Sequence, residues 1–213
     1  ELNTLMREHN MQRVFIKLAH GSSASGVIAY RINGSQHMAT AAIEMVREKN
    51  GFKLYNTRRI RTYNDVSEIE SLINAVCQHR VHVQQWIPKA RMDGKTFDLR
   101  VLVVDGTAAH TIARLSNSPM TNLHLLNERR HRDRVITHLG ESTFTRVMSL
   151  CEDAMTCFPK SLYAGIDVVV ASGHKQHYVI EMNAFGDLLN DAYYRGLSTC
   201  ALEIQRMSRY EHA

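Results

Sequence analysis

The chain has 213 residues, of which 44% are hydrophobic and 22% charged, and this ordinary globular balance excludes extended disorder. Its length suits one medium-sized domain or two small ones with a real core. The formal net charge of +5 favours an anionic partner. Nucleic acid is not expected, because no aromatic residues that could stack on bases interleave with the basic runs at 58–61, 128–134 and 206–209.

The four cysteines form no C-x-x-C pair and are typical of buried thiols in a reducing compartment. No stretch approaches the ~20 apolar residues that a membrane helix needs. We therefore expect a cytoplasmic protein without a membrane segment. The chain begins at Glu1 and not at a methionine, which indicates a fragment.

In chain order, the first part of the sequence alternates short β-type runs with turns. A helix follows, because apolar residues recur at helical spacing after Ser67, which we take as its N-cap. The expected strands cover 12–17, 27–31, 39–46 and 53–62, with turns at 33–34 and 50–51 and the helix over 67–78.

The second part is expected to contain two β-hairpins and two helices. Strands and helices mix without strict alternation, which favours an α+β fold over a doubly wound sheet. After a strand over 81–87, the hairpins are predicted at 96–104 with 107–113 and at 162–170 with 178–182, and the helices at 142–157 and 187–208, the latter with a break at Gly196.

The strongest candidate site lies in the second hairpin. If this hairpin is symmetric about His174, Asp167 lies opposite Glu181, and Asn183 projects from the same face. Opposed carboxylates repel each other, and an oxygen-seeking cation such as Mg²⁺ would relieve the repulsion. Spacing alone leaves open a second interpretation, in which both acids are solvated on an exposed face.

A second candidate is Lys17, which ends a strand before the small-residue loop Gly21–Gly26. Small residues let backbone N–H groups approach phosphate oxygens, and a lysine adds a positive charge. The order differs from that of a P-loop, because the lysine precedes the glycines and a strand follows. Taken alone, an ordinary turn is the commoner explanation.

A third candidate joins Asp98 and Arg100, on one face of a strand, with Arg114 on its hairpin partner. A strict two-residue hairpin would place Arg114 opposite Phe97, on the other face. A bulge or the strand end must therefore turn Arg114 if it joins the same site. An exposed charged ribbon is the alternative.

Other chemistries find little support. The twelve histidines include no H-E-x-x-H pair, and no G-x-S-x-G elbow or G-x-G-x-x-G motif is present.

Taken in order, these motifs resemble the ATP-grasp superfamily, and particularly the branch that contains the ribosomal-protein glutamate ligases (RimK-like). The resemblance runs from about Val14 to Asn190. The matching stretches are Val14–Lys17 with its loop, Val83–Pro88, Phe97–Gly106, Ala113-Arg114, Thr121–Leu125 and the pair Gly165–Asp167 with Glu181–Asn183.

The resemblance implies a role for each matching residue. ATP and Mg²⁺, with Mn²⁺ as an alternative, are the implied cofactors. The implied phosphate contacts are Lys17 and a flap containing Ser22, Ser23, Ser25 and Gly26; the adenine strand comprises Gln84, Gln85, Trp86 and Ile87; further nucleotide-side contacts are Asp98 and Asn122; the metal ligands are Asp167, Glu181 and Asn183; and the catalytic cations near the transferred phosphate are Arg100 and Arg114.

The implied fold is α+β, with two subdomains of mainly antiparallel sheets that enclose a nucleotide. Residues 1–87 would form the small flap subdomain and residues 88–213 the C-terminal subdomain with the metal site. The N-terminal domain that usually precedes these parts is not present in the sequence, and it would be a missing partner in cis.

The implied function is that of a carboxylate–amine ligase, which forms an amide or peptide bond through an acyl phosphate. Its substrates would be a small-molecule or peptide carboxylate and an amine. The alternatives are an ATP-binding module without independent catalysis and a small-molecule kinase of the ATP-grasp type. A homodimer is also open. Relatives often have a Pro/Gly turn where this chain has Ala184–Asp187, so the substrate of the relatives cannot be assigned to this chain.

Overall fold

A computed structural model describes residues 1–21, 24–49 and 51–210 of the chain. The chain divides into two compact units. Unit 1 comprises Glu1–Ile87 and Ser118–Asn127, and unit 2 comprises Pro88–Asn117 and the chain from Glu128 onward. Residues 118–127, which lie within the range predicted for the second subdomain, thus pack with unit 1. The predicted roles of the two subdomains remain predictions.

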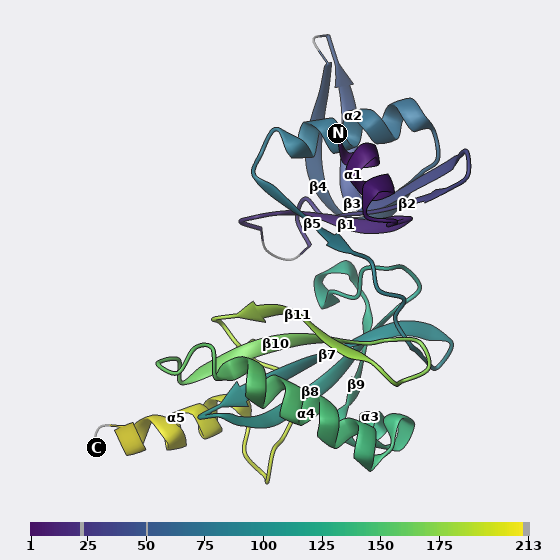
Figure 1. Ribbon diagram of the computed structural model, residues 1–213. Helices are drawn as coiled ribbons and strands as arrows, with labels where there is room; N and C mark the ends of the chain where they lie inside the picture. Colours follow the sequence, from purple (N-terminus) through teal and green to yellow (C-terminus); the bar gives the residue numbers. More distant parts are fainter. Residues whose placement is uncertain (22–23, 50, 211–213) are drawn as a thin grey trace. The chain divides into compact units, whose positions relative to one another are not determined.

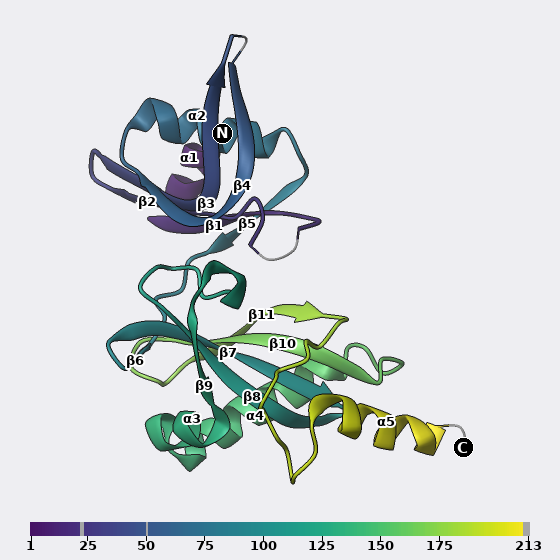
Figure 2. The same cartoon turned by 180° about the vertical axis from the view of Figure 1, so that it is seen from behind.

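Unit 1 is a five-stranded antiparallel sheet with two helices on one face (Figures 1 and 2). Its strand order is β4-β3-β2-β1-β5. In chain order its elements are α1 (Leu2–Glu8), β1 (Arg13–Leu18), β2 (Ile28–Asn33), β3 (Gln36–Glu48), β4 (Gly51–Tyr63), α2 (Val66–Cys77), β5 (Val81–Gln85) and the short 3₁₀ helix η1 (Leu123–Leu125).

Helix α2 forms where helical spacing predicts it. Its four apolar positions, Ile69, Leu72, Ile73 and Val76, are buried against the sheet. The N-cap is Asp65 and not Ser67, because the Asp65 carboxylate accepts a hydrogen bond of 2.9 Å from the backbone N–H of Glu68.

Strand β1 distributes its side chains between the two faces of the sheet. Val14 and Ile16 are fully buried beneath the helices, so the two-residue period directs Phe15 and Lys17 to the opposite, helix-free face. There Phe15 packs against a small apolar cluster that includes Met120 from the 118–127 segment. The segment is therefore anchored on the face that carries Lys17.

Unit 2 is a six-stranded antiparallel sheet with α3 and α4 on one face (Figures 1 and 2). The main strand order is β11-β10-β7-β8-β9, and β6 pairs with β7. Its elements are β6 (Arg91–Met92), β7 (Lys95–Val104), β8 (Thr107–Ser116), β9 (Glu128–His131), α3 (Arg132–Leu139), α4 (Glu141–Met155), β10 (Tyr163–Val170), β11 (His177–Asn183) and α5 (Thr199–Tyr210).

The core of unit 2 lies between the sheet and α4, where Phe97, Leu99 and Ile166 meet Phe144 and Val147. Because side chains alternate along a strand, this arrangement leaves Asp98, Arg100 and Asp167 on the opposite face, which we call the polar face of unit 2.

The predicted C-terminal helix over 187–208 is wrong in its first half. Helix α5 begins only at Thr199. The preceding segment contains four non-glycine residues with positive φ, Asp187, Leu189, Asp191 and Arg195. A right-handed helix cannot contain such residues.

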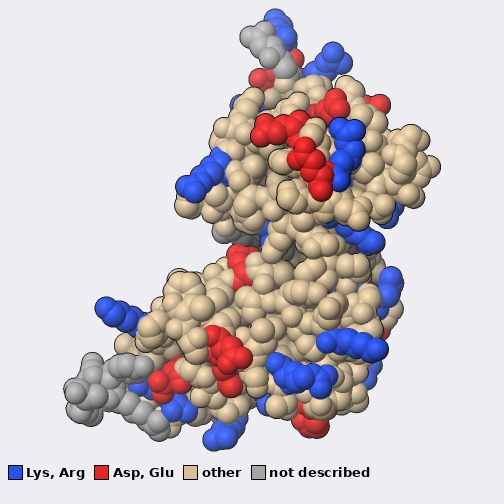
Figure 3. All heavy atoms as spheres, in the orientation of Figure 1, with Lys and Arg blue, Asp and Glu red and all other residues tan. Residues whose placement is uncertain are grey.

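On the side of the molecule seen in Figure 3, the basic side chains lie in separate groups interrupted by acidic ones and form no continuous basic surface over the described residues. Within the described part of the chain, no helix combines the length and apolar character needed to cross a membrane.

The burial of α4 predicts the reactivity of its thiol. Cys151 is fully buried in the core, and burial raises its pKa to about 12, whereas Cys77, Cys157 and Cys200 are exposed. Because the thiolate is the reactive species, we expect an aromatic disulfide reagent at pH 8 to label three thiols of the folded chain and a fourth only after denaturation. The Cys157→Ser control should lower the native count by one. Rapid labelling of Cys151 in the folded chain would contradict this packing.

Candidate functional site

A bulge in the β7–β8 hairpin places Arg114 on the polar face. The register shifts between Leu102 and Val103. Beyond this shift Arg114 lies opposite Asp98 and no longer opposite Phe97, as it would in a strict two-residue hairpin. Of the two alternatives that the sequence left open, a bulge or the strand end, the structure has the bulge.

Strand β10 continues the polar face on the other side of β7. Asp167 lies opposite Arg100 of β7 and opposite Glu181 of β11. The predicted pairing of the two acids is therefore confirmed. The predicted symmetry about His174 is wrong nearer the turn, where Val168 pairs with Val179 and Val170 with His177. The register shift between Asp167 and Val168 is what brings Asp167 opposite Glu181.

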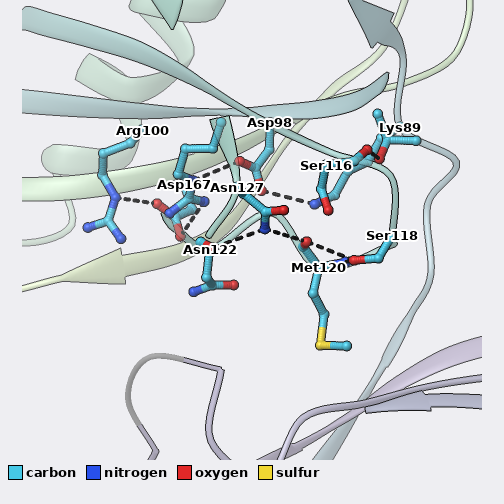
Figure 4. A network of polar contacts seen from close by, with 11 residues as sticks. Lys89, Asp98, Arg100, Ser116, Ser118, Met120, Asn122, Asn127 and Asp167 are labelled. Atoms are coloured by element: carbon cyan, nitrogen blue, oxygen red, sulfur yellow. Dashed lines mark hydrogen bonds and ion pairs between the residues drawn. The ribbon is translucent and has the colours of Figure 1, made fainter. Parts of the chain in front are cut away.

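Four ion pairs join five side chains on this face (Figure 4). Lys89 Nζ lies 3.0 Å from Asp98 Oδ2, and Arg114 Nε lies 2.8 Å from Asp98 Oδ1. Arg114 Nη2 reaches Asp167 Oδ2 at 3.0 Å, and Arg100 Nε lies 2.7 Å from Asp167 Oδ1. We call these five residues the buried charge network.

The network is closed to solvent and carries an excess of positive charge. The side chains of Asp98, Asp167 and Arg114 are at most 5% exposed, and that of Arg100 is 11% exposed. Burial lowers the pKa of Arg114, but Asp98 and Asp167 outweigh it, so this pKa lies above its ordinary value. Within the network three cations share two carboxylates, and the exposed carboxylate of Glu181 lies opposite Asp167 on the same face.

Asp98 lies at the base of the network. Its side chain is 2% exposed and contacts both Lys89 and Arg114. In this position Asp98 orients Arg114, and its own contact with a nucleotide remains a prediction. Lys89 could not be predicted from the sequence, because a lysine after a strand and a proline carries no local sign of burial.

The remaining predicted metal ligands lie beside Asp167. Glu181 is exposed, and Asn183 is half-buried. The Asn183 Nδ2 donates a hydrogen bond of 3.3 Å to the backbone oxygen of Gly165, which directs the amide oxygen away from that carbonyl. No group of three or more His, Cys, Asp or Glu residues that could hold a metal occurs within the described residues.

These residues fit a hard divalent cation. Asp167 and Glu181 are opposed across the strands, which is unfavourable for two carboxylates alone. Two carboxylates and the Asn183 amide supply only oxygen ligands, which Mg²⁺ prefers. To bind the cation, Asp167 would have to lose part of its contact with the two arginines. Its contact with Arg100 is an ion pair without hydrogen-bond geometry.

Gly165 allows two groups to approach the sheet closely. A Cβ at this position would lie 2.7 Å from the backbone oxygen of Gly186 and 2.8 Å from Arg100 Nη1. Any larger residue would displace the Arg100 guanidinium or the chain that follows β11. The glycine is thus required by close approach to its neighbours.

His110 ties the C-terminal segment to the polar face. It is fully buried on β8, and its Nε2 lies 2.9 Å from the backbone oxygen of Leu197. Burial lowers the pKa of His110, which favours a neutral ring that donates to this carbonyl.

In unit 1, the predicted nucleotide residues lie along β1 and β5. Gln84 pairs with Phe15 and shares its face of the sheet, which also carries Lys17. The Trp86 ring lies 5.3 Å from the Phe15 ring, and Gln85 pairs with β1 on the helix side. Ile87 ends the first segment of unit 1.

The predicted phosphate loop is described only in part. Ser22 and Ser23 lie outside the described residues. Gly26 has a φ of +67°, and a Cβ there would lie 2.4 Å from Leu18 Cδ1, so this position needs glycine. Ser25 precedes it, and its phosphate contact remains a prediction.

Asn122 lies in the 118–127 segment, whose conformation Asn127 fixes (Figure 4). The Asn127 Nδ2 donates to the backbone oxygens of Met120 at 2.9 Å and of Asn122 at 3.0 Å. Asn127 was not predicted from the sequence, because a side chain that holds a loop backbone belongs to no motif.

Two antiparallel sheets in separate units, each with helices packed on it, match the ATP-grasp fold class. Residues 1–185 match the family described as YheC/D-like ATP-grasp, and the chain belongs to that family. The predicted superfamily and α+β fold class are confirmed, while the RimK-like branch remains a prediction. No curated protein matches the chain.

Solved structures agree with the fold. The D-alanine–D-alanine ligase from Coxiella burnetii is 13% identical, with a TM-score of 0.50 over 99% of this chain and 50% of that one. The ATP-grasp ligase PsnB, complexed with a phosphomimetic variant of a minimal precursor, Mg and ADP, is also 13% identical, with a TM-score of 0.48 over 99% and 51% of the two chains. The chain therefore spans about half the length of these proteins.

The buried charge network predicts a large effect of removing Asp98. In Asp98→Asn, Lys89 and Arg114 lose a carboxylate they share, and we expect the free energy of unfolding to fall by about 3–5 kcal/mol. The matched control is Glu44→Gln, which breaks an exposed pair with Arg61 and should cost about 0–1 kcal/mol. Urea unfolding measures both. Equal effects would show that the network contributes no more than a surface ion pair.

Proposed function

We propose that this chain is the nucleotide- and metal-binding part of an ATP-dependent ligase that joins a carboxylate to an amine. The observation that carries the proposal is that four charged side chains lie on one face of the four neighbouring strands β11, β10, β7 and β8. They are Arg100, Arg114, Asp167 and Glu181. Membership of an ATP-grasp family supports it.

The proposed chemistry is phosphoryl transfer, in which catalysis consists mostly of positioning and charge neutralisation. Arg100 and Arg114 present guanidinium groups that suit phosphate oxygens. Asp167, Glu181 and Asn183 would hold Mg²⁺, with Mn²⁺ as an alternative. When bound, this ion supplies positive charge beside phosphate oxygens.

The proposed role of unit 1 is to bind the nucleotide. Lys17 adds a positive charge for the phosphates on the helix-free face, and the loop that ends at Gly26 would cover them. The backbone of Gln85 and Ile87 would contact the adenine edge, with Gln84 beside it. Asn122 would add a polar contact.

The proposed reaction has two balanced steps. A substrate carboxylate oxygen attacks the γ-phosphorus of ATP, and the bond to ADP breaks, which leaves an acyl phosphate. The amine nitrogen then attacks the acyl carbon, phosphate leaves, and the nitrogen loses a proton to solvent. No protein nucleophile is needed, so the arginines act on charge alone.

Binding of Mg-ATP tests the proposed site. A ligand at 100 times its Kd stabilises the native state by about 2.7 kcal/mol. We expect Mg-ATP to raise the unfolding temperature of the chain, and the shift to fall by more than half in Asp167→Asn and in Glu181→Gln. The control Asp153→Asn changes an exposed acid on α4 and should keep the full shift. Equal shifts in all four proteins would place the nucleotide elsewhere.

Catalysis is tested by phosphate release with pools of amino acids and short peptides. We expect release that needs both a carboxylate and an amine, with a product one amide bond larger by mass spectrometry. Arg114→Lys should lower the rate by at least about tenfold, because lysine cannot reproduce the paired contacts of a guanidinium. A phosphorylated metabolite would indicate a kinase, and binding without turnover in any pool would indicate a module without independent catalysis.

A further inference from the structure

Two arginines face each other on unit 1, at the end of β1 farther from Lys17 and beside Trp86, whose backbone N–H donates to the Arg13 carbonyl. Arg13 of β1 lies directly opposite Arg31 of β2. Both side chains are exposed, and the two-residue period places them on the helix-free face with Phe15 and Lys17. Like charges directly opposed across two strands destabilise a sheet. An anion beside the pair would offset this repulsion.

The protein supplies no such charge in the described part of the chain. Neither Arg13 nor Arg31 takes part in an ion pair there. Arg31 Nη2 donates to Met38 Sδ at 3.5 Å, and a thioether sulfur is a weak acceptor. Both guanidinium groups thus retain donors for an external anion.

The two arginines line a hollow of about 720 Å³ at one end of the sheet. The start of β1, the β2–β3 turn and Asn64 after β4 form its walls. Asn33 and Gln36 are opposed in the turn, two and five residues beyond Arg31, and add amide donors. No Asp or Glu is among the described residues that line it. We call this the arginine hollow.

We propose that the arginine hollow binds a phosphate group of a small molecule. A phosphate dianion balances two guanidinium charges, and its oxygens accept paired hydrogen bonds from the planar arginine fork. The side-chain amides of Asn33, Gln36 and Asn64 satisfy the remaining oxygens. The site is separate from Lys17, which lies four residues along β1, or about 13 Å at the usual strand rise. It does not depend on the proposed ligase function.

The test measures binding of inorganic phosphate by calorimetry to four forms of the chain. The double variant Arg13→Gln/Arg31→Gln removes both charges of the arginine hollow, and Lys17→Met removes the lysine of the proposed nucleotide face. Arg58→Gln is the matched control, because it removes an exposed arginine of the same sheet outside the hollow. Unfolding temperatures verify the fold, and the double variant should lose no stability, because it removes the opposed charges.

We expect phosphate to bind the unmodified chain and Arg58→Gln alike, and to bind the double variant at least about tenfold more weakly. The Lys17→Met variant should retain phosphate binding at the hollow. Citrate and glutamate serve as carboxylate competitors and should displace phosphate poorly. The proposal is overturned if the unmodified chain does not bind millimolar phosphate. It is equally overturned if Lys17→Met alone abolishes binding, or if the carboxylates bind more tightly than phosphate.

Discussion

The polar face of unit 2 depends on the ion pairs that Asp167 makes with Arg100 and Arg114. Folding withdraws these groups from water, which is costly unless each charge is paired. In the chain described here, they pair with one another. In the proposed function, the same groups would take different partners, because a carboxylate suits a cation and a guanidinium suits a phosphate. On the proposed function, ligand binding is therefore an exchange of partners within a pre-arranged set.

Lys89 and Asp98 explain why this exchange need not disorder the face. Asp98 holds Arg114 from below, and Lys89 balances the second oxygen of Asp98. Arg114 thus remains anchored when its other contact, to Asp167, is given up. Asp98 and Lys89 lie behind the groups proposed to face the ligand. The sequence indicates Asp98 as a site residue, whereas Lys89 belongs to no recognised motif.

Much of the site could be predicted because short hairpins fix strand register. Counting residues in a two-residue hairpin shows that Arg114 reaches Asp98 only if a bulge or the strand end turns it, and the structure has the bulge. The pairing of Asp167 with Glu181 was predicted from symmetry about His174, but it depends on a register shift that the sequence does not show. The burial of Lys89 could not be predicted, because it depends on contacts between distant segments. Apolar spacing suggested a helix over 187–208, but left-handed residues such as Asp187 and Asp191 end that pattern, and single-sequence periodicity cannot show them.

The central claim is that Asp167 changes partner between the arginines and a cation. The most direct measurement is a crystal structure of the chain with Mg²⁺ and a non-hydrolysable ATP analogue. The account predicts Mg²⁺ bound by oxygens of Asp167, Glu181 and Asn183, with Arg100 or Arg114 on a phosphate oxygen. A bound analogue with the cation elsewhere, and Asp167 still paired with both arginines, would contradict it.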